Sequence, residues 1–168
     1  MILIIFSSDI LLVLAFIVLM LVLGVGVVGS WIIEHLLLVS IVFFAVQFFV
    51  WLAGFSDIAG NSGLIVALIC SLIHAVCVVA AMMMVYADLV EYLAGGADSI
   101  GASLGALITF VLLFCVPEGI WLSAIAKSGP LVTLIITIVY AVYIFGVGQA
   151  GGGVLAVFQH ARQIAAQL

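Results

Sequence analysis

Charged side chains are scarce in this sequence. Only 5% of the 168 residues are charged and 70% are hydrophobic, whereas soluble domains carry about 25% charged residues. A soluble chain of this size must still cover its core with polar groups. The composition therefore excludes an ordinary soluble domain and predicts an all-α membrane protein, because helices satisfy their own backbone hydrogen bonds in lipid. We expect no soluble domain.

Basic residues are the scarcest charged class. Lys127 and Arg162 are the two basic residues of the chain, against seven acidic ones, and the formal net charge is −5. Nucleic-acid binding needs a basic surface, so this composition argues against a nucleic-acid partner. The positive-inside rule has almost no charges on which to act, and the orientation in the membrane is therefore not predicted.

Recognisable catalytic motifs are also missing from the sequence. It contains no P-loop, no dinucleotide-binding fingerprint and no Ser–His–Asp arrangement with plausible placement. The three cysteines, Cys70, Cys77 and Cys115, all lie in apolar runs, where thiols usually serve as packing residues. We expect a protein that is not an enzyme and that holds no cofactor and no metal.

Long uncharged runs are what the sequence has in abundance. They predict a polytopic protein, a single transmembrane domain over residues 1–168 with about five membrane-spanning helices. These spans are expected near 10–28, 31–55, 64–87, 100–125 and 131–158. A single helix over 10–55 would be about 69 Å long, twice what a bilayer accepts. We therefore expect a tight turn near Gly29 and Ser30.

The third predicted span, residues 64–87, organises the rest and carries His74 near its middle. An ionisable group inside a membrane calls for a functional hypothesis. Cys70, His74 and Cys77 share one helix face, which allows a metal site. A haem ligand and a proton-sensitive switch are the other functional interpretations. The structural interpretation is a neutral histidine that forms a hydrogen bond across helices, for example to Gln47.

Small residues predict where helices approach closely. Gly101 and Gly105 form a GxxxG pattern in the fourth span, which favours close helix contacts within one chain or in a homo-oligomer. A second group of glycines interrupts the last span and predicts a flexible segment. Its members are Gly146, Gly148, Gly151, Gly152 and Gly153. After them, residues 154–168 suit either an amphipathic interfacial helix or the last turns of one long helix.

Acidic residues gather in two predicted connectors, 56–63 (SDIAGNSG) and 88–99 (DLVEYLAGGADS). Connectors this short cannot form a binding domain, so we expect them to serve as contacts for a partner protein. The contact residues expected there are Asp57, Asp88, Glu91 and Asp98. In the fourth span, Pro117 and Glu118 are expected to end or kink the helix. Trp121 and Lys127 would then mark its interfacial exit.

These whole-chain features resemble the envelope fusion proteins of the cystoviruses, the enveloped double-stranded-RNA bacteriophages. The resemblance rests on the acidic connectors, the absence of bases before Lys127 and the glycine-rich segment 146–159 (GVGQAGGGVLAVFQ). It implies a multi-span protein of the virion envelope that lies in the lipid bilayer. Such a protein anchors a receptor-binding spike protein and takes part in fusion with the host outer membrane. The resemblance transfers no catalytic or binding residue.

Two alternatives belong to other classes of protein. One is a small multi-span subunit of an energy-transducing respiratory complex, which the number of spans favours. The sequence is expected to offer such a subunit no carboxylate or lysine in the middle of a helix, and this argues against it. The other alternative is a holin-like or secretion-channel component of a membrane.

Overall fold

The computed structural model describes residues 2–58, 63–150 and 152–168, with the side chains of residues 2–9, 47, 50–58 and 63 excepted. The described backbone is helical, with short connections and no strand, as the composition predicted. The elements are α1 (Ile2–Leu23), α2 (Val25–Glu34), α3 (Leu36–Ile58), α4 (Gly63–Ala94), α5 (Ser99–Phe110), the π-helical turn η1 (Val111–Cys115), α6 (Val116–Ile125), α7 (Pro130–Gln149) and α8 (Val154–Ala165).

Within the described residues, three helices are long and apolar enough to cross a membrane. They are Leu64–Ala94, Ser99–Ile125 and Pro130–Gln149, and a fourth span exists if α1 and α2 together form one bent span. Large hydrophobic side chains are exposed over the surface of the bundle, among them Val42, Ile138 and Val142. Lipid tails suit such a surface, and by these criteria the chain is a helical membrane protein.

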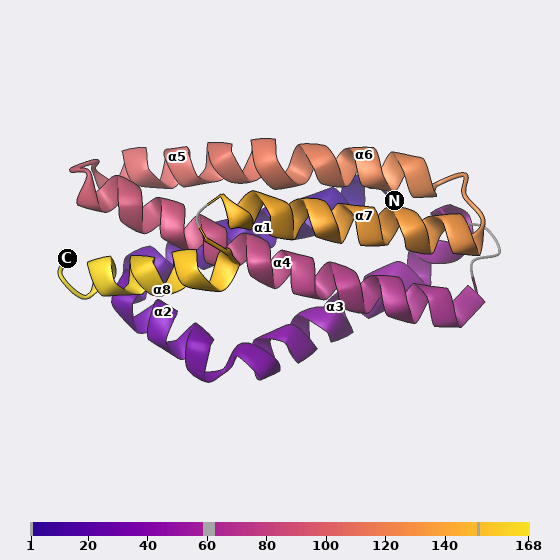
Figure 1. The fold of residues 1–168 in the computed structure, drawn as a ribbon, viewed down its shortest axis with the longest axis horizontal. Coiled ribbons are helices and arrows are strands. Elements are labelled where there is room, and N and C mark those ends of the chain that lie inside the picture. Colours follow the sequence, from indigo (N-terminus) through magenta and orange to yellow (C-terminus); the bar gives the residue numbers. More distant parts are fainter. Residues whose placement is uncertain (1, 59–62, 151) are drawn as a thin grey trace.

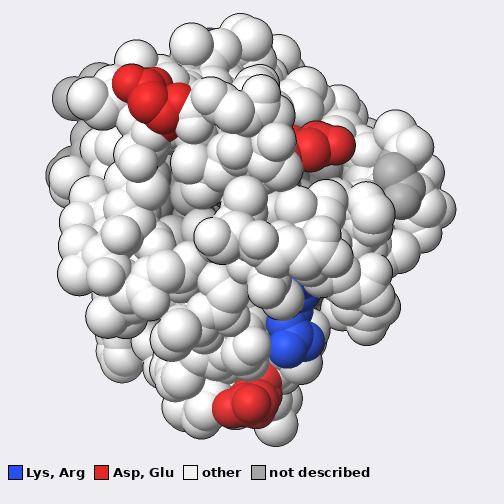
Figure 2. All heavy atoms as spheres, turned by 90° about the vertical axis from the view of Figure 1, so that its left-hand side faces the viewer, with Lys and Arg blue, Asp and Glu red and all other residues white. Residues whose placement is uncertain are grey.

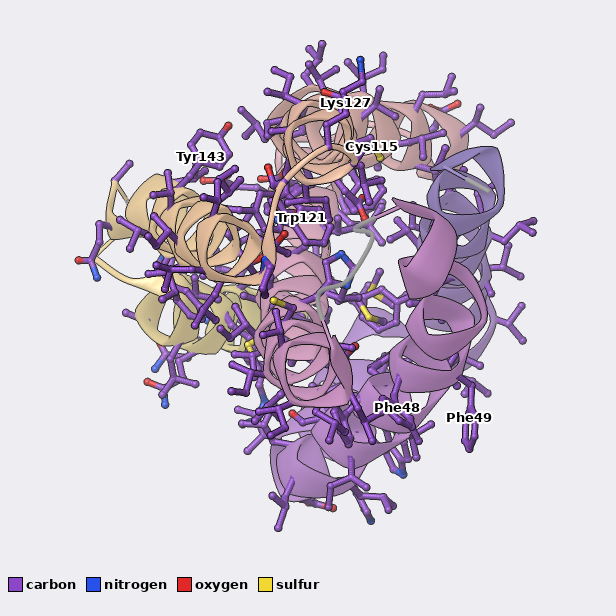
Figure 3. The ribbon with its side chains drawn as sticks, turned by 90° about the vertical axis from the view of Figure 1, so that its right-hand side faces the viewer. Phe48, Phe49, Cys115, Trp121, Lys127 and Tyr143 are labelled. Carbon is purple, nitrogen blue, oxygen red and sulfur yellow. The ribbon has the colours of Figure 1, made fainter. Side chains whose placement is uncertain are left out.

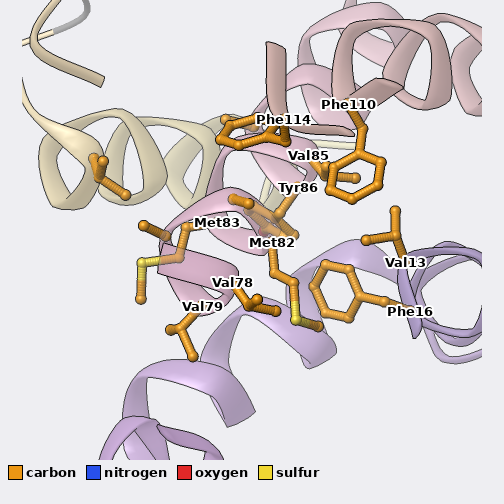
Figure 4. Packing of buried hydrophobic residues seen from close by; sticks show 14 of the residues in the cluster. Val13, Phe16, Val78, Val79, Met82, Met83, Val85, Tyr86, Phe110 and Phe114 are labelled. Atoms are coloured by element: carbon orange, nitrogen blue, oxygen red, sulfur yellow. The ribbon is translucent and has the colours of Figure 1, made fainter. Parts of the chain in front are cut away.

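Helix α4 forms the centre of the bundle. It packs against α3, α5, α7 and α8, and the other helices surround it when the bundle is seen from one end (Figure 3). A helix that is hydrophobic all round is a buried helix, and residues 85–87, 89 and 90 of α4 are all buried. Figure 4 shows part of the core, where Phe16 of α1 lies beside Met82 of α4.

The first bend of the chain is at Gly24. The prediction of a turn near Gly29 and Ser30 was wrong, because both residues lie inside α2, and the axes of α1 and α2 differ by 118° across Gly24. Gly24 has φ 91°, a backbone conformation that costs residues with a Cβ atom roughly 1–2 kcal/mol. Gly29 serves a different purpose, since it lies against the ring of Tyr86.

A second interruption falls at His35, so the predicted span 31–55 is not one helix. Helix α2 ends at Glu34 and α3 begins at Leu36. The backbone N–H of His35 donates to the carbonyl of Trp31, and its Nδ1 lies 2.9 Å from the same oxygen. This arrangement caps the last turn of α2, and the two rings stack with centroids 4.8 Å apart. Helices α2 and α3 consequently form the V that is visible at the bottom of Figure 1.

The connector predicted over residues 88–99 is mostly helix. Helix α4 continues to Ala94, so Asp88 and Glu91 lie in its last turns rather than in a loop. The remaining connection turns at Gly96, which has φ 87°. Asp98 then caps α5, because its carboxylate accepts a hydrogen bond from the backbone N–H of Gly101 at 2.8 Å.

The glycine pattern of α5 divides into two roles. A Cβ atom added at Gly105 would lie 2.7 Å from Cε2 of Tyr92, so this glycine sits where α4 and α5 approach closely. Gly101 is exposed in the first turn of α5, and within this chain its nearest neighbour is the capping carboxylate of Asp98.

We expect Gly105→Leu to destabilise the bundle by about 1–2 kcal/mol, because the larger side chain must displace the Tyr92 ring. The effect is moderate because Tyr92 is 42% exposed and can move. Gly146→Leu is the matched control, since no atom lies within 4 Å of its Cβ position. Unfolding in mixed detergent micelles would measure both variants. Equal stabilities of the two variants would contradict the contact.

The glycine segment 146–153 is only partly irregular. Gly146 and Gly148 lie inside α7, Gly151 lies outside the described residues, and the chain turns at Gly152 and Gly153. The N–H of Gly153 donates to the carbonyl of Gly148 at 2.9 Å, which is the long-range bond of a glycine-terminated helix end. The turn starts a separate helix, α8, rather than a continuation of α7.

Helix α8 is a separate, amphipathic helix, which agrees with one of the two alternatives that the sequence left open. Its buried face consists of Val154, Phe158, Ala161 and Ala165, and it packs on α4 and α2. Leu155, which follows Val154 directly, is 52% exposed. The apolar face of α8 is therefore covered mainly by this chain itself.

We expect Gly153→Ala to destabilise the protein by about 1–3 kcal/mol, because Gly153 has φ 109° and ψ 146°, a backbone conformation that essentially only glycine adopts. Gly146→Ala is the control. It lies in regular helix with open space around it, so alanine should stabilise by about 0.5–1 kcal/mol. Equilibrium unfolding would measure whether the two substitutions change stability in opposite directions. A loss of stability in Gly146→Ala as well would contradict the special backbone conformation assigned to Gly153.

Candidate functional site

The centre of the bundle holds a buried histidine–glutamate pair. His74 of α4 is 0% exposed and Glu118 of α6 is 3% exposed. Nε2 of His74 lies 2.9 Å from Oε1 of Glu118. One proton lies between these atoms whether the pair is neutral or ionised. The sequence singled out His74 but gave Glu118 no role beyond ending or kinking a helix together with Pro117.

The helix geometry before Glu118 explains how this carboxylate turns inward. Pro117 has no N–H, and its ring would clash with the carbonyl of Leu113 in a regular α-helix. The chain widens just there into the π-helical turn η1, which ends at Cys115. The helix then continues as α6, so Pro117 does not end it. Turns of this kind are frequent at functional sites.

Aromatic rings surround the histidine. The rings of His74 and Trp121 are stacked with centroids 5.2 Å apart, and the Tyr140 ring from α7 lies 5.1 Å from that of Trp121. Trp121, which the sequence placed at an interfacial exit, is 3% exposed, and its side chain lies in the interior of the bundle in Figure 3.

Hydroxyl groups of α7 connect to this aromatic group. Nε1–H of Trp121 donates to Oγ1 of Thr137 at 3.1 Å, and that hydroxyl donates to the carbonyl of Thr133 at 2.8 Å. Both threonines are 0% exposed. Buried polar groups need such partners, so α4, α6 and α7 are joined by polar contacts inside an apolar bundle.

The space beside Glu118 is very small. A void of about 10 Å³ lies between Cys77, Glu118, Phe114 and Tyr140, among others. That volume holds roughly one water molecule and no organic substrate. The arrangement is therefore suited to hold or pass a proton, and to fix the relative positions of three helices.

The structure also bears on the metal, haem and structural interpretations of His74. Within the described part of the chain, no three His, Cys, Asp or Glu side chains are placed to hold a metal ion. His35 caps α2 and His160 is exposed on α8. The side chain of Gln47, the partner suggested for a structural histidine, lies outside the described residues. Glu118 takes that role in the structure.

The acidic residues predicted to contact a partner do not form one site. Asp88 is half-buried and Glu91 is exposed on α4, while Asp98 caps α5. The side chain of Asp57 is outside the described residues. Figure 2 views the end of the bundle where α4 and α5 meet, and the acidic side chains visible there lie apart from one another, one of them beside a basic side chain.

Glu118 also corrects one argument made from the sequence. The respiratory alternative was disfavoured because no carboxylate was recognised in the middle of a helix. The helical stretch Ser99–Ile125 contains Glu118, and its carboxylate lies inside the bundle. That argument against the alternative no longer holds.

No protein-family model, curated protein or solved structure matches this chain.

Proposed function

We propose that this protein is an integral membrane protein of a viral envelope, similar to the cystovirus fusion proteins, which anchors a receptor-binding spike and takes part in fusion with the host outer membrane. The observation that carries the proposal is the distribution of polarity over the described surface. Apolar side chains cover the sides of the helices. The short connections at 95–98 and 126–129 lie at opposite ends of the α5–α6 rod (Figure 1).

A five-span topology is part of this proposal. In Figure 1, α1, the α2–α3 pair, α4, the α5–α6 rod and α7 run alternately in opposite directions along the long axis. Each of these five segments would cross the membrane once, with no separate soluble domain. A protein of this form presents lipid-facing sides and short polar ends, so a separate spike would have to supply the receptor-binding domain.

Contacts with the spike would be polar and would lie at the ends of the bundle. Glu91 and Asp98 are exposed near the α4–α5 connection. They are available to a partner, and copies of the chain would assemble through their exposed apolar sides. The exposed carboxylates of Glu91 and Asp98 favour a partner with basic or hydrogen-bond-donating groups.

The fusion step would use the joint between α7 and α8. Arg162 of α8 donates a hydrogen bond from Nη2 to Oγ of Ser30 in α2, at 3.1 Å. Movement of α8 about Gly152 and Gly153 would break this contact and free α2. The bent α1–α2 pair would then be able to change its depth in the bilayer.

A second candidate function follows from the His74–Glu118 pair. A buried carboxylate hydrogen-bonded to an imidazole is the kind of group that relays protons in membrane complexes. A subunit of an energy-transducing complex would use this pair for proton transfer.

Reconstitution into vesicles distinguishes the two functions. We expect the purified protein to promote mixing of lipids and contents with vesicles of phosphatidylethanolamine and phosphatidylglycerol. Gly153→Ala should slow this mixing, because it alters the joint. Proton flux that a pH-sensitive dye detects in the absence of mixing, and that Glu118→Gln removes, would favour the second function. Isolation of the native protein within a respiratory complex would overturn the first.

A further inference from the structure

A deep apolar groove lies between the V of α2 and α3 and the helices α1 and α4. Its volume is about 400 Å³, and its lining consists of apolar side chains that include Phe16, Val28, Trp31, Val39, Phe43 and Met83. We infer that this groove is a binding site for one acyl chain of a membrane phospholipid. The inference does not depend on a viral role, because it requires only that the bundle lies in a bilayer.

The volume of the groove distinguishes between two occupants, an acyl chain and a helix from a second copy of the protein. An apolar cavity of about 150 Å³ holds a benzene molecule. In proportion, 400 Å³ accommodates roughly sixteen carbon atoms, the length of a common acyl chain. An α-helix about 10 Å across fills roughly 420 Å³ per turn. The groove would therefore hold about one helical turn, which is too little to seat a helix from a second copy.

The floor of the groove differs from an ordinary lipid-facing surface. Phe16, Met82 and Met83 line it, yet they are only 5–7% exposed. The rim is open, since Trp31 is 47% exposed and Leu38 52% exposed. A chain lying on this floor is enclosed by several helices, whereas a surface lipid touches one side only. The methionine side chains are flexible enough to follow its shape.

The apolar lining of the groove favours contact with the acyl chain of the lipid rather than with its headgroup. Among the described side chains, no charged one lines the groove, and neither Lys127 nor Arg162 takes part in it. Leaving such a space empty in a bilayer would forfeit dispersion contacts along its walls. An acyl chain restores these contacts without adding a polar group that needs a partner.

Photocrosslinking tests the site. The probe is a phosphatidylcholine with a diazirine in the middle of one acyl chain, diluted into nanodiscs of ordinary phosphatidylcholine that contain the full chain. We expect labelled peptides that include Met82 and Met83, because these floor residues are otherwise buried. Ala15→Phe places a ring in the groove. It should lower floor labelling by about tenfold, which corresponds to about 1.4 kcal/mol.

Ala124→Phe is the matched control, because Ala124 is an exposed alanine on α6 that does not line the groove. Floor labelling of this variant should equal that of the wild type. Phe43→Ala enlarges the groove and should raise floor labelling, which keeps the test valid if Ala15→Phe does not fold. Absence of floor labelling in the wild type, or undiminished labelling in folded Ala15→Phe, would refute the site. Crosslinks from α2 or α3 to a second copy in place of lipid would also refute it.

Discussion

Glu118→Ala is expected to lower the free energy of unfolding by about 3–5 kcal/mol, the largest effect of any single substitution proposed for this protein. The reason is the burial of its partner. His74 is 0% exposed and its Nε2 lies 2.9 Å from the carboxylate. Removal of the carboxylate leaves an imidazole without this bond in an apolar bundle, and a buried polar group without its partner is costly.

The matched control for this loss is Glu91→Ala. Glu91 is also a glutamate in a helix, but it is exposed near the end of α4. Surface substitutions usually change stability by less than about 0.5 kcal/mol. Unfolding of both variants in mixed micelles with increasing denaturing detergent would measure the difference. A loss of similar size in the two variants would show that the buried pair does not stabilise the bundle.

Two further variants separate the pair from the packing around it. Glu118→Gln keeps a hydrogen-bonding group beside Nε2 and should cost less than Glu118→Ala. Replacement of both residues by leucine removes the polar groups together, and such exchanges are often neutral or stabilising. A stable double variant that has lost proton flux or fusion activity would assign the pair a functional role. A double variant that keeps full activity would assign it to structure alone.

The sequence predicted one half of this pair and missed the other for a definite reason. His74 stood out because it interrupts a long apolar helix. Glu118 follows Pro117 directly, and a proline usually ends or kinks a helix. The π-helical turn at Val111–Cys115 lets the helix continue. Its position depends on the packing of α5 and α6 against other helices, which a local pattern does not contain.

The glycines show the same division between local and tertiary information. Their number predicted bends and close contacts, and both exist. Which glycine bends the chain depends on what surrounds each one. Gly24 takes the positive φ, while Gly29 and Gly105 lie against tyrosine rings. Neither tyrosine is close to its glycine in the sequence, so spacing alone cannot assign these roles.

The close approach at Gly29 leads to the second large effect. A Cβ atom at this position would lie 2.5 Å from Oη and 2.8 Å from Cζ of Tyr86, and 3.1 Å from Cγ of Arg162. Tyr86 is 0% exposed and packs on Phe158 of α8, with ring centroids 4.8 Å apart. The ring has no free space into which it could move.

We therefore expect Gly29→Ala to destabilise the protein by about 1–3 kcal/mol through overpacking. Gly26→Ala is the control in the same helix. The nearest atom to its Cβ position is the carbonyl oxygen of Ala165 at 3.8 Å, an ordinary contact. Alanine is a better helix former than glycine, so this control should gain about 0.5–1 kcal/mol. The two alanine substitutions should therefore change the free energy of unfolding in opposite directions.

Tyr86→Phe tests the cause of the loss at Gly29. The Tyr86 hydroxyl is buried and has no hydrogen-bond partner among the described residues, so its removal alone should be close to neutral. Combined with Gly29→Ala, it removes the nearest atom, Oη, but leaves Cζ in place. The double variant should therefore recover part of the lost stability. If Gly29→Ala is as stable as Gly26→Ala, or if Tyr86→Phe restores nothing, then α2 is not held against α4 through this contact.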